Sequence, residues 1–178
     1  MKNMVLLVID VQNALVEDQP YRCEEVIQNI KSLIDTARSN DVEVLYVCHD
    51  DGKGSELEKG TYGWQVYDLI APVQGEKIID KNFNSAFHRT KLRDYLEEKK
   101  IKSLMIVGMQ TEYCVDTTIK SAFDYEYKMY VPEGANTTFD NDRLSGEVIH
   151  RFYNQDIWDK RFEDVISMDE ALKIIKNK

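Results

Sequence analysis

The chain has 178 residues, of which 43% are hydrophobic and 31% are charged, and its net charge is −9. These values are typical of one globular domain spanning residues 1–178 and exclude a disordered chain. They also argue against a nucleic-acid partner, because phosphate contacts need clustered Lys and Arg, whereas these residues are scattered here among acids.

The sequence also gives expectations about the cellular compartment. No apolar run approaches the ~20 residues of a membrane-spanning helix, so we expect no membrane contact. The amino-terminal residues lack the pattern of a signal peptide. The cysteines, Cys23, Cys48 and Cys114, are odd in number and have no metal-binding spacing, which fits a reducing environment. We therefore expect a cytoplasmic protein.

Short apolar runs alternate with segments of helical periodicity along the chain. The runs predict strands over 5–9, 42–48, 78–80, 104–107, 128–131 and 164–166, and the periodic segments predict helices over 24–40, 89–100, 114–123, 141–156 and 168–176. A loop is expected after the first strand, around Asp18-Gln19-Pro20. This alternation indicates right-handed βαβ units. We predict an α/β fold of three layers (α/β/α), with a doubly wound, mostly parallel, six-stranded Rossmann-like sheet.

Residues 50–66 form a long irregular stretch with four glycines. Unstructured loops of this length are uncommon unless they are functional. Tyr62 and Trp64 favour an ordered loop near a site over a mobile linker. We expect substrate specificity to reside partly in this loop.

The stretch from Gly108 to Val115 combines a strand end, a glycine turn and a cysteine that opens a helix. Cys114 is expected in or just before the first helical turn, where unpaired N–H groups and the helix dipole favour an anion. The thiol pKa is then expected to be lowered, giving a nucleophile near neutral pH. A buried structural cysteine is the alternative.

Reactive residues follow three of the predicted strands: Asp10 the first, Lys81 the third and Cys114 the fourth. The carboxyl ends of central strands converge on one crevice in a doubly wound sheet. Asp10 would there accept the thiol proton, and Lys81 would stabilise the thiolate. Taken singly, Asp10 could be a turn residue and Lys81 a solvated cation.

These residues belong to motifs that carry a family resemblance. The motifs are Asp10-Val11-Gln12-Asn13, Lys81 with Asn84-Ser85-Ala86-Phe87, and Gly108-Met109-Gln110-Thr111-Glu112-Tyr113-Cys114-Val115 with Thr118 and Ala122. With them the sequence resembles the isochorismatase-like cysteine hydrolases, which include nicotinamidases and related amidohydrolases. The resemblance implies a catalytic triad of Asp10, Lys81 and Cys114. It further implies a cis peptide at Met109–Gln110 and an oxyanion hole made by the backbone N–H groups of Gln110 and Cys114.

The sequence departs from the metal-binding members of that family. Nicotinamidases hold a metal with an Asp-x-His and a further His after the second strand, whereas this loop reads His49-Asp50-Asp51 without a later histidine. We therefore predict no metal and no cofactor, and do not expect nicotinamide as the substrate. His49 is expected to be a strand-end hydrogen-bonding residue, and His88 and His150 to be surface or helix residues.

The expected function is a metal-independent cysteine amidohydrolase. It would cleave a C–N bond of a small soluble amide, lactam or ureido compound through a thioester, with Leu15, Trp64 and Tyr113 lining the substrate pocket. Members that cleave isochorismate do not depend on a cysteine, so the presence of Cys114 favours hydrolysis of a C–N bond.

Other functions stay open on the sequence alone. They are a non-catalytic binding or assembly protein, a nicotinamidase or isochorismatase activity, and a thiol redox role with Cys23 or Cys48 as the resolving thiol. A homo-oligomer, dimer or tetramer, is expected from the family and from the aromatic residues between Phe152 and Phe162.

Overall fold

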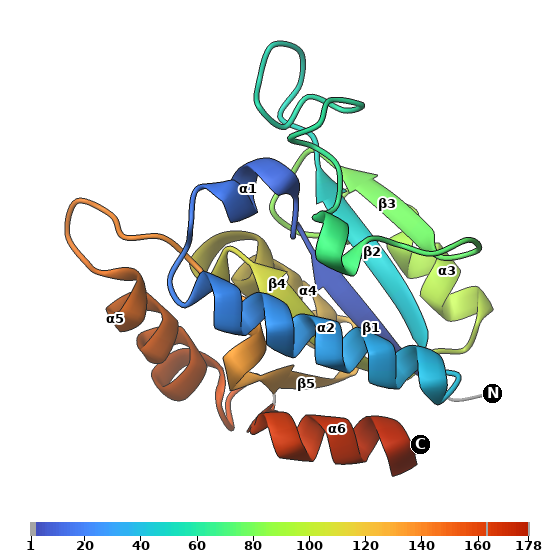
Figure 1. Ribbon diagram of the computed structural model, residues 1–178. Helices are drawn as coiled ribbons and strands as arrows, with labels where there is room; N and C mark the ends of the chain where they lie inside the picture. The colour runs from blue at the N-terminus through green and yellow to red at the C-terminus, as the bar shows by residue number, and fades with distance from the viewer. Residues whose placement is uncertain (1–2, 163, 178) are drawn as a thin grey trace.

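The computed structural model describes residues 3–162 and 164–177, whose strands form one seven-stranded sheet in which every pair of neighbours is parallel (Figure 1). The order is β3-β2-β1-β4-β5-β7, and β6 pairs with β4 beside this path. The strands are β1 (Met4–Ile9), β2 (Glu43–His49), β3 (Lys77–Lys81), β4 (Ser103–Met109), β5 (Lys128–Pro132), β6 (Asn136–Thr137) and β7 (Asp164–Ile166). The predicted doubly wound parallel sheet is confirmed, with β6 as an added short strand.

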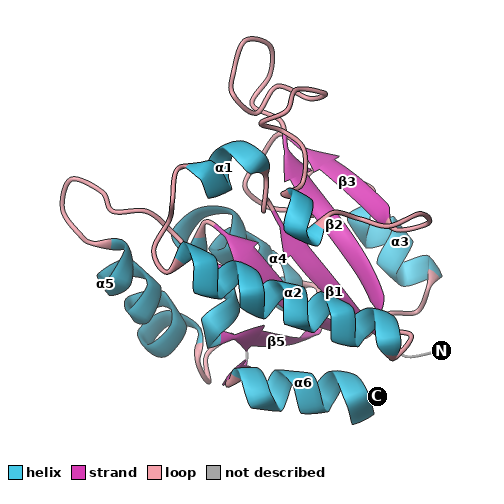
Figure 2. Cartoon of the chain, viewed as in Figure 1, coloured by secondary structure: helices cyan, strands magenta, loops and turns pink. Residues whose placement is uncertain are grey.

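Helices cover both faces of the sheet (Figures 1 and 2). They are α1 (Asn13–Glu17), α2 (Cys23–Ser39), α3 (Leu92–Glu98), α4 (Asp116–Asp124), α5 (Gly146–Arg151) and α6 (Met168–Asn177). Alternate residues of β1 point to opposite faces, so Leu6 and Val8 pack with α2 and α6, whereas Leu7 and Ile9 pack with α3 and α4. Two apolar cores therefore cover the strands from both sides, which explains their unbroken hydrophobic runs.

Some predicted helices differ from those observed. The helix expected over 89–100 starts only at Leu92, since Arg89 has a positive φ of 55°. The helix expected over 141–156 starts at Gly146, capped by the Ser145 hydroxyl, and continues as a π-helical segment, Phe152–Trp158. No helix in 3–162 or 164–177 is long and apolar enough to cross a membrane.

Helix α1 lies where the sequence predicts a loop. Its first N–H groups, those of Asn13 and Ala14, donate to the carbonyls of Gln65 and Gly63 at 2.9 and 3.1 Å. Both partners belong to the 50–66 loop, so contacts distant in the sequence stabilise this short helix. The hydrophobic periodicity of residues 13–17 therefore does not predict this helix.

The two central strands approach each other closely at Gly108. This residue has a φ of +125°, and a Cβ placed on it would lie 2.0 Å from the Ile9 carbonyl oxygen. Only glycine fits both the backbone angle and the space. The following Met109–Gln110 peptide bond is cis. Gly108 thus allows the close approach of β1 and β4, the two strands that precede Asp10 and Cys114.

We predict that Gly108→Ala lowers the free energy of unfolding by on the order of 3 kcal/mol or more, because the methyl group adds a backbone clash to the unfavourable φ. Urea unfolding measures this. Gly75→Ala is the matched control, since Gly75 also has a positive φ, +97°, but no atom within 4 Å of the added Cβ. Equal losses in the two variants would show that the contact with Ile9 is unimportant.

Candidate active site

Three residues from separate strand ends meet at the carboxyl edge of the sheet. Asp10 follows β1 with a φ of 50°, Lys81 ends β3, and Cys114 lies in the π-helical turn Thr111–Val115 that leads into α4. The Lys81 ammonium lies 2.7 Å from Asp10 Oδ2 and 3.2 Å from Cys114 Sγ. The structure therefore brings the three predicted residues together, with Cys114 in the first turn of the helical segment as predicted.

The ion pair between Asp10 and Lys81 is buried, the two residues being 1% and 2% exposed. Lys81 uses its three donors fully, because it also donates to His49 Nδ1 at 2.8 Å. Asp10 Oδ1, in contrast, has no hydrogen-bond partner among the described residues. A carboxylate oxygen and the Cys114 sulfur lie within 4.8 Å of each other. Asp10 is therefore placed to accept a proton from the thiol.

The Cys114 thiol does not have the lowered pKa that its position in the sequence predicts. Burial raises the pKa of Cys114 to about 12, the negative charge of Asp10 adds to this rise, and Lys81 opposes it. Desolvation of the thiolate thus outweighs the nearby ammonium. Cys114 rests as a thiol at neutral pH and ionises only as its proton moves to a base.

His49 has both ring nitrogens engaged. Its Nδ1 accepts from Lys81, so Nε2 carries the proton and donates to Asp51 Oδ1 at 2.8 Å. The predicted role of His49 as a strand-end hydrogen-bonding residue is confirmed. His88 lies on the surface beside the site, while His150 is buried on α5 and bonds the Glu133 carbonyl.

Asp10, His49 and Cys114 form a group whose side-chain ligand atoms all lie within 4.8 Å. The residues do not fit a metal cation, for two reasons. His49 has no free lone pair, and the Lys81 ammonium contacts all three side chains and would repel a cation. The absence of a metal stays a prediction, and no chemical step below uses one.

A cavity of about 220 Å³ opens above the thiol. Its lining is Asp10, Leu15, His49, Asp51, Leu57, Asn84, Met109, Gln110, Tyr113 and Cys114. Leu15 and Tyr113 thus lie where the sequence analysis expected them. Trp64 is not part of this lining, because its ring packs against the apolar core. Asp51 and Leu57 show that the 50–66 loop does contribute to the site.

The buried Gln12 side chain joins this loop to the sheet. Its Nε2 donates to the carbonyls of His49 and Trp64 at 3.0 and 2.8 Å, and its Oε1 accepts from the His49 N–H at 2.9 Å. Asn13 adds a bond from Nδ2 to the Tyr62 carbonyl. The Asp-Val-Gln-Asn motif therefore supplies a reactive carboxylate and, two and three residues later, the amides that order the pocket wall.

A second buried network supports the turn that carries Cys114. Thr111 donates to Asn136 Oδ1 at 2.9 Å, and Asn136 and Asn154 exchange side-chain hydrogen bonds at 2.9 and 3.1 Å. All three residues are fully buried. Thr111 belongs to the motif quoted from the sequence, whereas sequence reasoning missed Asn136 and Asn154, since a lone Asn in a run of mixed polarity gives no signal.

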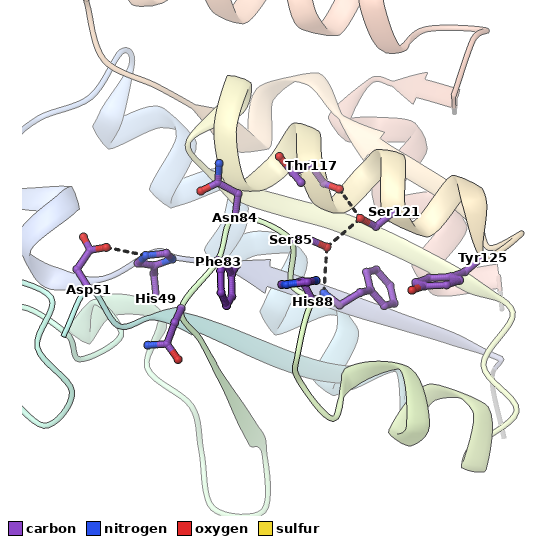
Figure 3. A pocket seen from close by; sticks show the side chains of 11 residues that line it. His49, Asp51, Phe83, Asn84, Ser85, His88, Thr117, Ser121 and Tyr125 are labelled. Atoms are coloured by element: carbon purple, nitrogen blue, oxygen red, sulfur yellow. Dashed lines mark hydrogen bonds and ion pairs between the residues drawn. The ribbon is translucent and has the colours of Figure 1, made fainter.

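A wider cavity of about 630 Å³ adjoins the first, sharing His49, Asp51 and Asn84 with it (Figure 3). We call it the outer groove; its further lining is Asn82, Phe83, Ser85, Phe87, His88, Thr117, Ser121 and Tyr125. In Figure 3 these side chains run from Asp51 and His49 at one end to Tyr125 at the other. The motif after Lys81 therefore forms one wall and α4 the other.

Comparison with known proteins decides the family. The family model described as "Isochorismatase domain" matches residues 4–170. The chain belongs to the isochorismatase family. This confirms the resemblance drawn from the motifs, and the protein is accordingly a hydrolase.

Individual isochorismatase-family relatives agree with this assignment. The chain is 29% identical to "N-carbamoylsarcosine amidase" of Arthrobacter, covering 94% of this chain and 69% of that protein. It is 28% identical to "Nicotinamidase 3" of Arabidopsis thaliana, covering 79% and 76% of the two chains. The crystal structure of a cysteine hydrolase from Pseudomonas syringae superposes with a TM-score of 0.91 at 25% identity, covering 98% of this chain and 93% of that one.

We predict that the rate at which iodoacetamide alkylates Cys114 rises about tenfold per pH unit from about pH 7 to about pH 10. This slope is expected because the whole range lies below the raised pKa of the thiol. Peptide mass spectrometry measures the rate. The thiolate fraction then keeps growing over this range. The same cysteine in urea-unfolded protein is the control and should reach a plateau soon after its ordinary pKa of ~8.5. A plateau at that pH in the folded protein would contradict the raised pKa.

Proposed function

We propose that this isochorismatase-family hydrolase is a metal-independent cysteine amidohydrolase that cleaves a C–N bond of a small amide, lactam or ureido compound. The observation that carries the proposal is the buried contact of Lys81 with both Asp10 and Cys114 at the floor of the cavity. The relatives named an amidase and a nicotinamidase support a substrate with a C–N bond.

The first step of the proposed reaction forms a thioester. The Cys114 thiol gives its proton to Asp10 while its sulfur bonds to the carbonyl carbon of the substrate. The raised pKa of Cys114 makes this coupled transfer necessary, because little free thiolate exists at pH 7. Asp10 then passes the proton to the leaving nitrogen, the C–N bond breaks, and the amine departs.

The second step hydrolyses the thioester. Asp10, again a carboxylate, takes a proton from water as the water oxygen bonds to the acyl carbon. The C–S bond breaks, the sulfur regains the proton, and the acid product leaves. We assign the backbone N–H groups of Gln110 and Cys114 to the developing oxyanion, since Gln110 borders the cavity and Cys114 lies in the first turn of its helix, where N–H groups lack helical partners.

A redox role is less well supported. Cys23 and Cys48 are buried, and both belong to the apolar core on the face of α2 and α6, whereas Cys114 packs with the core on the opposite face. Burial also raises the pKa of Cys48, which disfavours its attack as a thiolate.

We further propose that the enzyme works in the cytoplasm as a homo-oligomer, dimer or tetramer. Leu144 just before α5, Val148 on α5 and Phe152 just after it are 38–48% exposed, and exposed apolar side chains of this kind favour a covering partner. Sedimentation at micromolar concentration tests the assembly, and a species with the mass of one chain would contradict it.

We predict that Cys114→Ser lowers kcat/KM by at least about 10³-fold on any amide that the wild-type enzyme hydrolyses, because the hydroxyl replaces the better nucleophile. The measurement is a panel of amides, lactams and ureido compounds, with intact-mass detection of an acyl adduct in the wild type. Cys23→Ala is the control and should keep full activity.

The same assays distinguish the alternatives. We expect wild-type activity to survive prolonged dialysis against a chelator, because no proposed step uses a metal. A wild-type protein that hydrolyses no member of the panel, while thiol labels prefer Cys23 or Cys48, would favour the non-catalytic binding protein instead.

A further inference from the structure

The outer groove has no role in the chemistry just described. The inner cavity, at about 220 Å³, is smaller than the ~300–1,000 Å³ of pockets that hold drug-sized ligands. The outer groove, at about 630 Å³, continues from it past Asn84, whose Oδ1 lies 3.9 Å from Cys114 Sγ. A substrate bound at Cys114 therefore has room to extend into the groove.

The groove offers partly exposed aromatic rings to such an extension. Phe83 and Tyr125 are 43% and 40% exposed, although large aromatic side chains are usually mostly buried. Between them lie the hydroxyls of Ser85 and Ser121, 2.8 Å apart (Figure 3). Because Ser121 donates to the Thr117 carbonyl, Ser85 donates to Ser121, and neither hydroxyl has a proton left for a ligand. The exposed rings favour a planar group that stacks on them.

The guanidinium of Arg89 lies beside Phe83, one of the residues that line the outer groove. The guanidinium carbon of Arg89 lies 5.3 Å from the Phe83 ring centroid, and Arg89 makes no ion pair with any residue that the structure describes. Arg93, which covers Tyr125 at 4.3 Å, is by contrast bonded to Glu97. In a chain of net charge −9, a guanidinium without an acidic partner beside a groove favours an anionic ligand.

We propose that the substrate of this site is an amide that carries a planar anionic group, of the aromatic carboxylate class. The amide carbon lies at Cys114 in the inner cavity. The planar group stacks on Phe83 in the outer groove, and its carboxylate is held by Arg89. This assignment rests on the proposed function, since it places the reacting bond at Cys114.

Binding to the Cys114→Ser protein tests the proposal without turnover. The probes are propanamides bearing a terminal para-carboxyphenyl group, its neutral para-acetylphenyl counterpart, or a non-planar trans-carboxycyclohexyl group. In the propanamides the ring group is attached on the carbonyl side of the amide. A second series, N-substituted acetamides with the same three groups, attaches it on the nitrogen side. We expect the carboxyphenyl probe of one of the two series to bind about tenfold tighter than both of its counterparts by calorimetry.

Variants assign this preference to residues. In the Cys114→Ser background, Arg89→Gln should remove the preference for the carboxylate over the acetyl group, and Phe83→Leu should remove the preference for the planar over the cyclohexyl ring. Arg161→Gln is the matched control, because Arg161 also lies over a phenylalanine ring, that of Phe162, at 5.9 Å, but Phe162, unlike Phe83, does not line the outer groove. It should change neither preference.

Equal affinities for the three probes in both series, or preferences that survive Arg89→Gln and Phe83→Leu, would overturn the assignment. This failure differs from failure of the proposed function. Selective binding without wild-type hydrolysis of the same probes would remove the amidase proposal, whereas hydrolysis of simple amides without selective binding would remove only the substrate assignment.

Discussion

The buried Lys81 ammonium is the constraint on which the site depends. An unpaired charge at this depth would cost several kcal/mol, and Lys81 avoids that cost only because Asp10, His49 and Cys114 each present an acceptor to it. Asp10 and Cys114 come after β1 and β4, and His49 is the last residue of β2; these three strands are neighbours in the sheet. Lys81 comes from edge strand β3, in register with His49, so its long stem reaches across two strands to the thiol. The contacts of the Lys81 ammonium therefore depend on the order of the strands and on the register of β3 with β2.

This arrangement also sets the protonation of the site. The positive charge of Lys81 and the negative charge of Asp10 compensate each other, and the thiol beside them stays neutral because burial raises its pKa. The group of Asp10, Lys81 and Cys114 therefore carries no net charge before reaction, which suits an uncharged carbonyl. Charge would separate only when the sulfur bonds to carbon, and the backbone N–H groups of Gln110 and Cys114 are the donors that we propose for the oxyanion that then forms.

The sequence predicted the features that follow from local pattern and from β-strand ends. The six main strands, α2 and α6 follow from periodicity, and Asp10 and Lys81 follow from their place after a strand. It could not predict features that depend on contacts distant in the sequence. Helix α1 needs carbonyls from beyond residue 60, the half-buried Trp64 packs against the apolar core, and the raised pKa of Cys114 reflects a burial that no motif reveals. The outer groove likewise arises only when the segment after Lys81 lies beside α4.

The hydrogen bonds of Gln12 have a consequence for the kinetics of binding. Its amide joins the end of β2 to the 50–66 loop, and the partners of its hydrogen bonds are all backbone groups of the protein itself. The pocket wall is thus ordered during folding, so a ligand need not immobilise this loop when it arrives. Association with such a preformed cavity is limited by encounter and desolvation, and differences between ligands then appear mainly in how slowly each one leaves.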